Sequence, residues 1–473
     1  MRDLTTVASH VIIGGGITGL LAAHVLAQRK DGRSVMVIES ADNVGGLLRS
    51  FDYGEFGHFD HGTHIMAETG ETQLDKLLFD CVPDGDWLIL EGAKRDLAGI
   101  FFDGRLQLNS IYMDLRNLPT PILSGCVGDF MLNLGRHQSH QFHDASAYAI
   151  SRFGESIANR AVIPSVEKLF GVEASKLDPM ATMLTSMERV ILFDETSSCD
   201  LMNSELMRDR IAYPEQRNLP SHWASSKRSY YPKGFGMHRF ISGLRLTLQR
   251  LGVKIFTNAS LQKIEVTKGQ VSSLQILHEQ EYLKIGNVAS CCWTVGAPQL
   301  TKLLGLKVSP TGLDKALRTV VVNLLVDKAP ATGDLYYFYC YDKGFKTFRV
   351  TNYSNYCGNA PRQGMFPLSI ELLVDSQLAD DSVGLLRTAI TEIKALGVLD
   401  ESAKITFSKV EVLANGFPMP TTRNLRYLDD VREAIQDCGL TNLYMLGIFS
   451  RPRLFFQRDI MIHTYRTLID ANI

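Results

Sequence analysis

The feature that most constrains the fold of this chain is an apolar strand pattern followed at once by closely spaced glycines near the N-terminus. Residues 11–13 are apolar and β-branched, and Gly14, Gly16 and Gly19 follow in G-x-G-x-x-G spacing before an apolar helical pattern. Such glycines permit a tight turn, the approach of backbone to a pyrophosphate, and close packing of helix on strand. The helix N-terminus supplies free N–H groups to the phosphates. The stretch therefore predicts a dinucleotide-binding βαβ unit.

A second apolar run, residues 35–38, ends in Glu39. Glu39 lies about twenty residues beyond the glycines, where a ribose-binding carboxylate is expected. A carboxylate accepts hydrogen bonds from ribose hydroxyls and would repel a 2′-phosphate, so an unphosphorylated ribose is favoured over NADP. Ile17 and Thr18 in the glycine loop, and Ser40 after the acid, are expected to contact the same cofactor.

Composition indicates a globular protein and gives no sign of a charged macromolecular partner. The 473 residues are enough for two or three domains, and 45% are hydrophobic and 21% charged. The formal net charge of -2 gives no electrostatic reason to expect nucleic acid or an anionic membrane. No apolar run reaches the roughly twenty residues that span a bilayer. The eight cysteines are scattered without a C-x-x-C pair. We therefore expect reduced thiols, a cytoplasmic location and no membrane span.

The stretch after Glu39 is rich in glycine and histidine. Gly45 and Gly46, with Leu47 beside them, allow close approach of the backbone to a cofactor, and Arg49 is placed to counter a phosphate charge. Histidines recur at a spacing of three in two sets: His58, His61 and His64, then His137, His140 and His143. No carboxylate pattern accompanies either set, so we expect loop histidines in preference to a metal site.

The rest of the chain combines helical and strand patterns. Helices are expected where apolar residues recur at helical spacing: 73–87, most of 144–190, 237–251, 385–396 and 459–470. Strands are expected in β-branched or alternating runs: a hairpin at 100–108, then 254–256, 261–266, 288–295, an antiparallel sheet over 318–374, and 442–447. Residues 203–227 have little periodicity and two prolines, which predicts a linker or lid.

These motifs together resemble the FAD-dependent superfamily of amine oxidases, protoporphyrinogen oxidase and UDP-galactopyranose mutase, with the mutases nearest. VIIGGGITGL, Glu39 and NVGGLLRS are similar to the superfamily's FAD signature. The sequence FDHGTH is similar to the mutase loop in which a glycine and a histidine lie against the flavin. This resemblance implies flavin contacts for Gly62, Thr63 and His64. Two further segments, RFGESIANRAVIPSVEKLFGV and YYPKGFG, follow mutase landmarks in order.

Two segments of this resemblance concern the substrate. The sequence FRVTNYSNY is similar to the eukaryotic-type mutase strand whose arginine holds the substrate diphosphate, which implies that role for Arg349. The sequence IFSRPR resembles a segment ending in an arginine near the flavin, here Arg453. Residues from Gln457 to Asp459 would then cap the final helix at the isoalloxazine.

The C-terminal segment also departs from the mutase pattern. Pro452 stands where the family has a glycine, and Phe455 and Phe456 stand where a phosphate-binding tyrosine is expected. Phenylalanine cannot donate a hydrogen bond to a phosphate. FAD binding is therefore better indicated than a UDP-sugar substrate.

The resemblance implies an α/β fold, α+β overall, with a discontinuous Rossmann-like FAD-binding domain, an inserted helical subdomain and an antiparallel β-sheet substrate domain. The expected boundaries are 1–70, 228–300 and 440–473 for the FAD domain, 71–227 for the helical subdomain with its lid, and 301–439 for the sheet domain.

Non-covalent FAD and a small-molecule substrate are expected, and the electron donor or acceptor is not indicated. The first interpretation is a redox-neutral rearrangement of a nucleotide-linked sugar by reduced flavin. The alternative is an oxidoreductase in which oxidised flavin accepts a hydride. A flavoprotein fold retained only for binding is a third possibility.

Overall fold

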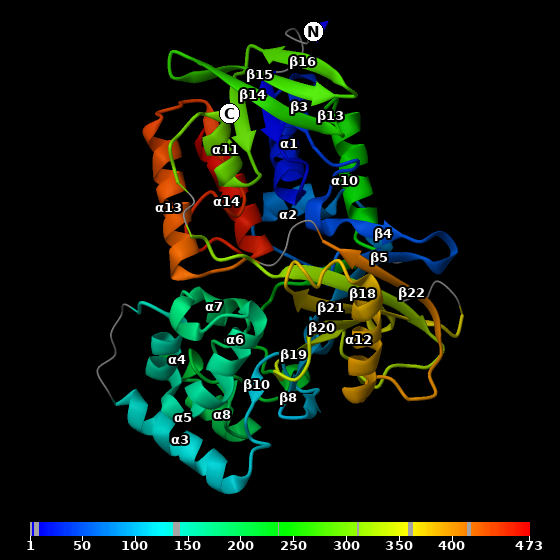
Figure 1. Ribbon diagram of the computed structural model, residues 1–473, viewed down its shortest axis with the longest axis vertical. Coiled ribbons are helices and arrows are strands. Elements are labelled where there is room, and N and C mark those ends of the chain that lie inside the picture. The colour runs from blue at the N-terminus through cyan, green and yellow to red at the C-terminus, as the bar shows by residue number, and fades with distance from the viewer. Residues whose placement is uncertain are drawn as a thin grey trace.

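The computed structural model describes residues 2–3, 9–135, 142–234, 236–309, 312–357, 363–413 and 418–473. The molecule is elongated, with a nucleotide-binding half at one end and a second half, made of a large sheet beside a helical bundle, at the other (Figure 1). No helix among the described residues is long and apolar enough to cross a membrane. His137 and His140 of the second histidine set lie outside the described residues.

The nucleotide-binding half is built on a five-stranded parallel sheet in the order β13-β3-β2-β17-β23. Its strands come from distant parts of the chain: β2 (His10–Ile13), β3 (Val35–Ile38), β13 (Lys254–Phe256), β17 (Ser290–Trp293) and β23 (Leu443–Met445). The central strands are buried on both faces, which explains their continuous apolar runs.

Both faces of this sheet are covered. One face packs on α1 (Ile17–Arg29), which contacts α10 (His238–Arg250) and α14 (Gln457–Asp470). The other face shares a core with α11 (Ala297–Leu303), α13 (Thr422–Asp437) and a four-stranded sheet. The strands of that sheet are β1 (Arg2–Asp3), β16 (Glu281–Gly286), β15 (Gln270–His278) and β14 (Ala259–Thr267).

The second half contains a seven-stranded sheet in the order β22-β18-β21-β20-β19-β8-β9. Its strands are β8 (Ala98–Phe102), β9 (Arg105–Gln107), β18 (Arg318–Val326), β19 (Tyr337–Cys340), β20 (Thr347–Asn352), β21 (Phe366–Val374) and β22 (Ile405–Val412). All pairings are antiparallel except β8 with β19. One face packs on α12 (Ser382–Ala395), so the opposite face is available to the nucleotide-binding half.

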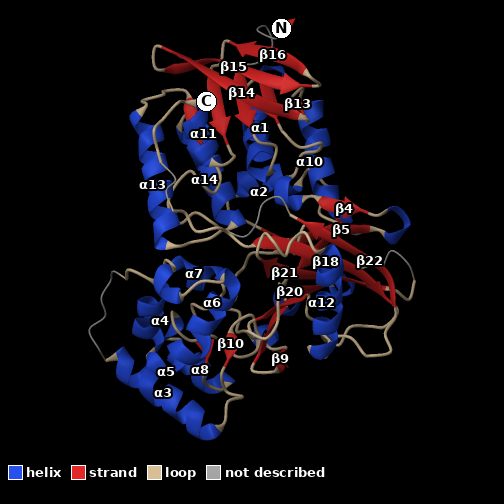
Figure 2. Ribbon diagram, viewed as in Figure 1, coloured by secondary structure: helices blue, strands red, loops and turns tan. Residues whose placement is uncertain are grey.

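A helical bundle lies beside this sheet, and Figure 2 shows that it is built mainly of helices. Its helices are α3 (Thr120–Leu134), α4 (Ala145–Phe153), α5 (Glu155–Ile157), α6 (Ile163–Phe170), α7 (Met180–Leu184), α8 (Glu195–Leu201) and α9 (Glu205–Arg208). The bundle also holds the short parallel pair β10 (Met113–Asp114) and β11 (Val190–Ile191).

Two small sheets connect the halves. The first pairs β4 (Ser50–Asp52) with β5 (His58–Asp60). The second has the order β6-β12-β7, with β6 (Met66–Ala67), β12 (Ser229–Pro232) and β7 (Trp87–Leu90).

The predicted α/β fold class is confirmed, and so is the hairpin at Asp103 and Gly104, where φ is 52° and 69°. Positive φ at both central residues is what a two-residue hairpin turn of the right twist requires. The helix predicted over 73–87 was wrong beyond Phe79. There α2 (Thr72–Phe79) ends, and the chain turns at Pro83 and enters β7.

Two other differences concern helices. No helix was predicted after the strand at 288–295, yet α11 begins at Ala297, because the proline that follows is tolerated in the first turn of a helix. The long helix α13 was not predicted. The domain boundaries given above stay a prediction.

Candidate functional site

The glycine loop lies between β2 and α1, and each glycine has a different environment. Gly14 has a φ of +105°, and a Cβ there would lie 2.4 Å from Thr294 Oγ1. A Cβ on Gly19 would lie 1.9 Å from the carbonyl oxygen of Gly14. By contrast, no described atom lies within 4 Å of the Cβ position of Gly16, the N-cap residue of α1. Open space at a helix N-terminus fits a pyrophosphate.

Glu39 directly follows β3 and lies beside this loop. Its Oε2 accepts a hydrogen bond from Gly15 N at 2.6 Å, and its Oε1 accepts one from Ala41 N at 2.7 Å. The exposed Ser40 hydroxyl donates to Oε1 at 3.3 Å. The carboxylate is half-buried and fixed next to the glycine loop, as a ribose ligand would need to be.

Gly45 and Gly46, which we call the second glycine pair, lie against the glycine loop. Together with the loop and Glu39 they form a cradle for a cofactor. Gly45 N donates to Gly15 O at 2.7 Å, and a Cβ on Gly46 would lie 3.2 Å from Gly16 Cα. Leu47 beside them is half-exposed. Arg49 Nη2 donates to Asp42 Oδ1 at 2.7 Å, so part of the charge predicted to face a phosphate is already balanced.

The histidine-containing segment, residues 61–64, lies against the seven-stranded sheet. A Cβ on Gly62 would lie 3.1 Å from Glu371 Oε2 and 3.2 Å from Arg349 Nη2. Thr63 N donates to Glu371 Oε1 at 3.4 Å, and the Thr63 and Thr351 hydroxyls share a hydrogen bond. The structure thus brings the predicted flavin-contacting segment and the predicted substrate arginine together.

Arg349 forms a buried ion pair with Glu371. Its Nε and Nη2 donate to Glu371 Oε1 and Oε2 at 2.6 and 2.7 Å, and the two side chains are only 15% and 4% exposed. Strand register pairs Tyr339 with Arg349 and Arg349 with Glu371, so all three share one face. The guanidinium also lies 5.8 Å from the Tyr339 ring and 5.6 Å from the Phe348 ring. Both oxygens of the Glu371 carboxylate therefore accept hydrogen bonds from Arg349.

Two further titratable groups face this pair. Burial, and then the charge of Arg349, lowers the pKa of His64 to about 4, so its imidazole is neutral at pH 7. Burial raises the pKa of Asp96, while a hydrogen bond from Tyr337 and the charge of Arg349 oppose that shift. Asp96 has a φ of 44°, in the left-handed region that aspartate tolerates, and its carboxylate accepts a hydrogen bond from Tyr337. We call His64, Asp96, Tyr337, Arg349 and Glu371 the polar cluster.

Glu371 and Asp96 were not predicted from the sequence. Glu371 has a recognisable signal, because it is the only charged residue in the otherwise apolar strand sequence LSIELLV. A buried charge of this kind requires a partner. Asp96 lies in an irregular segment and has no comparable signal.

The interactions described for Arg453 and Asp459, the C-terminal residues predicted for the site, do not involve the polar cluster. Arg453 is 65% exposed and its Nη2 lies 3.5 Å from Asp178 Oδ2. Asp459 lies in the first turn of α14, but the N-cap of that helix is Phe456, which corrects the predicted cap. Among the described residues, no group of three or more His, Cys, Asp or Glu side chains could hold a metal ion.

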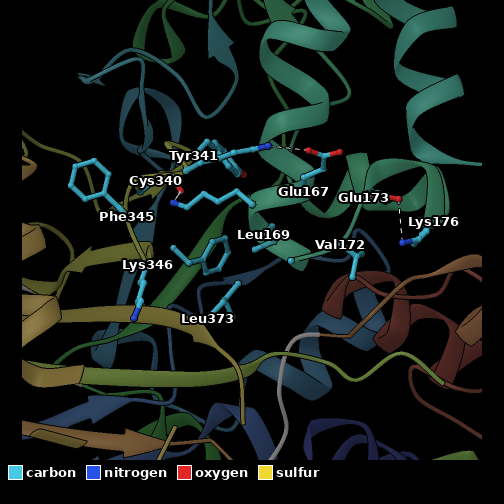
Figure 3. Close-up of a pocket in the computed structure, with 14 residues that line it drawn as sticks. Glu167, Leu169, Val172, Glu173, Lys176, Cys340, Tyr341, Phe345, Lys346 and Leu373 are labelled. Carbon is cyan, nitrogen blue, oxygen red and sulfur yellow. Dashed lines mark hydrogen bonds and ion pairs between the residues drawn. The ribbon is translucent and has the colours of Figure 1, made fainter. Parts of the chain in front are cut away.

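A cavity of about 610 Å³ is lined by Phe348 and by residues of α6. Figure 3 shows Glu167 and Leu169 of that helix at the cavity. Its lining is partly apolar, and it also carries four lysines against two glutamates: Lys168, Lys176, Lys343 and Lys346, with Glu167 and Glu173. Lys343 and Lys176 pair with the glutamates at 3.0 and 3.2 Å. The cavity therefore has an excess of positive charge.

The N-terminal part of the chain matches one protein-family model. Residues 12–80 match the family model described as an NAD(P)-binding Rossmann-like domain, which confirms the predicted dinucleotide-binding unit. No curated protein gives a significant match to the chain.

Solved structures of the same fold cover the whole chain. A reduced UDP-galactopyranose mutase has a TM-score of 0.72 and 17% identity, covering 98% of this chain and 96% of its own. A protein provisionally named as a protoporphyrinogen oxidase, from Exiguobacterium sp. 255-15, has 0.67 and 16%, covering 100% and 98%. A putrescine oxidase bound to putrescine has 0.60 and 14%, covering 100% of both chains. These similarities show that the chain has the fold that the sequence resemblance implies.

Proposed function

We propose that this chain is an FAD-dependent flavoenzyme with its substrate site at the polar cluster. The support is the open cradle at Gly16, the carboxylate of Glu39, and the contact of residues 61–64 with Arg349 and Glu371. FAD would be held by the glycine loop that follows β2, by Gly45 and Gly46, and by Glu39, and when bound it supplies a two-electron acceptor for substrate oxidation. Arg349 and the neighbouring side chains would then orient the substrate.

An oxidoreductase is the chemistry that this geometry favours, and the observation that carries it is the Arg349–Glu371 pair. A diphosphate needs an arginine free to donate, but Glu371 accepts two of the donors of Arg349 and balances its charge. Separating the pair would leave Glu371 unpaired in a buried site, which costs about 3–5 kcal/mol. We therefore expect a substrate without a strongly anionic group at Arg349.

A redox-neutral mutase acting on a nucleotide-linked sugar is the second candidate. The sequence alone favoured it, through the resemblance of FRVTNYSNY, and the lysine-rich cavity beside Phe348 is compatible with an anionic group at that position. In this case the diphosphate would contact the lysines of the cavity, and Arg349 would keep Glu371 as its partner.

Anaerobic incubation of the FAD-loaded protein distinguishes the two candidates. UDP- and dTDP-sugars and a panel of amines, alcohols and alkenes are each added with and without dithionite. An oxidoreductase bleaches the oxidised flavin absorbance when its substrate is added, without dithionite. Conversion of a nucleotide sugar that occurs only with dithionite would support the mutase and overturn the first candidate.

A further inference from the structure

Asp60 is a fully buried carboxylate outside the polar cluster. It ends β5, and its side chain has no exposed surface. Oδ1 accepts hydrogen bonds from Ser50 Oγ at 2.6 Å and Met237 N at 2.8 Å, and Oδ2 accepts one from the Tyr231 hydroxyl at 2.6 Å. Since these donors belong to β4, the start of α10 and β12, one carboxylate joins three segments that are distant in sequence.

One of these segments, α10, lies beside the proposed pyrophosphate site. Ile241 of α10 packs on the second glycine pair, since a Cβ on Gly45 would lie 3.0 Å from Ile241 Cγ2. Gly45 in turn donates to Gly15 O at 2.7 Å, beside the N-terminus of α1. A displacement of α10 would therefore be transmitted directly to the glycine loop.

The third connection is to the histidine-containing segment, which follows Asp60 directly. His61 N donates to Arg49 O at 3.1 Å, and Gly62 lies on Arg349 and Glu371. Asp60 is thus the residue at which the segment between the glycine loop and the polar cluster is anchored.

We infer that Asp60 is a positioning residue that holds β4, α10 and residues 61–64 in the arrangement that FAD binding needs. The inference rests on the proposed function, because FAD is the ligand. A side chain without acceptors would leave the buried Met237 N–H unpaired and would release the Ser50 and Tyr231 hydroxyls. An unpaired buried donor destabilises the arrangement in which Met237 N faces residue 60, and this favours a displacement of α10.

The carboxylate is available as an acceptor at neutral pH. Burial raises the pKa of Asp60 to about 6, so it is ionised at pH 7.5. The titratable groups that face it are the phenols of Tyr231, Tyr353 and Tyr356 and the thiol of Cys357. Burial raises the pKa of each of them, so they stay neutral there.

The test is the affinity of the full-length apoprotein for FAD, followed by quenching of flavin fluorescence at pH 7.5. Asp60→Leu should bind FAD about tenfold more weakly or worse. Asp60→Asn should remain within about threefold of wild type, because its Oδ1 still accepts from Ser50 and Met237. The matched control is Asp114→Leu. Asp114 is also buried, but it lies in β10, in the half of the molecule away from α1 (Figure 1), and it pairs with Arg116.

Asp60→Leu and Asp114→Leu with equal FAD affinity would overturn the inference, because the loss would then follow from general destabilisation. Should Asp60→Leu not fold, the double variant Ser50→Ala/Tyr231→Phe removes two of the three hydrogen bonds and is compared with Tyr341→Phe, which loses a buried hydroxyl bonded to Thr185 O. Equal FAD affinities of this double variant and Tyr341→Phe would also overturn the inference. A wild-type protein that binds no FAD would instead contradict the proposed function, and the inference with it.

Discussion

At the scale of single residues, Glu371 determines what Arg349 can bind. Glu371→Gln should make the guanidinium available to anions while preserving the shape of the site. We expect UDP, as a diphosphate probe, to bind this variant about tenfold or more tightly than wild type, the gain typical of a new charge-assisted contact. Calorimetric titration of UDP measures the difference.

The double variant Arg349→Ala/Glu371→Gln should lose this gain. The control Glu265→Gln changes a half-exposed carboxylate in the nucleotide-binding half and should have no effect. Tight UDP binding by wild type that is lost in Arg349→Ala alone would contradict this account. It would return the diphosphate role to Arg349.

Asp60 also gives a prediction about stability and pH. Its pKa is raised to about 6 in the folded protein and is near 3.9 when unfolded, so the folded state binds the proton more tightly. Stability therefore falls as pH rises from about 4 to 6, by up to about 3 kcal/mol. Asp60→Asn, which has no charge to bury, should have a higher Tm than wild type at pH 7.5 and a similar Tm at pH 4. Differential scanning fluorimetry across this range measures the difference, and a Tm gap that does not depend on pH would contradict the assignment.

At the scale of elements, two glycines at the start of α1 have different roles. We expect Gly16 to matter for FAD binding and Gly19 to matter for the stability of the fold. Gly16→Val should leave the fold intact, because the φ of Gly16 is -69° and open space surrounds its Cβ position, but the side chain would occupy the proposed pyrophosphate site. Gly19→Ala should lower Tm, because its Cβ would collide with Gly14 O. Circular dichroism and FAD titration of both variants measure the two effects. Retained FAD affinity in Gly16→Val would place the pyrophosphate elsewhere.

Local patterns predicted those elements that are determined by local chemistry. The glycine loop and the hairpin at Asp103 and Gly104 need particular backbone angles, and the sequence supplies the residues that adopt them. The end of α2 was misjudged because the apolar spacing continues past Phe79. There Trp87 instead pairs with Pro232 in a strand from a distant part of the chain.

At the scale of the whole molecule, the arrangement of the substrate site depends on contacts that no local pattern contains. The site needs β8 to pair in parallel with β19, across more than two hundred residues of chain, and the segment at residues 61–64 to lie on β20 and β21. The sequence identified Arg349 and His64 through a family resemblance. It did not identify Glu371 as the partner of Arg349, because only the register of two strands brings them together.

The central claim is that this chain binds FAD in the cradle formed by the glycine loop that follows β2, by Gly45 and Gly46, and by Glu39. The most direct test is the visible absorbance spectrum of the purified full-length protein, taken before and after reconstitution with FAD and again after heat denaturation. We predict the two visible bands of oxidised flavin, about one FAD per chain, and full release of the flavin on denaturation, since the expected attachment is non-covalent. A protein that is colourless as purified and stays colourless after reconstitution would contradict the account.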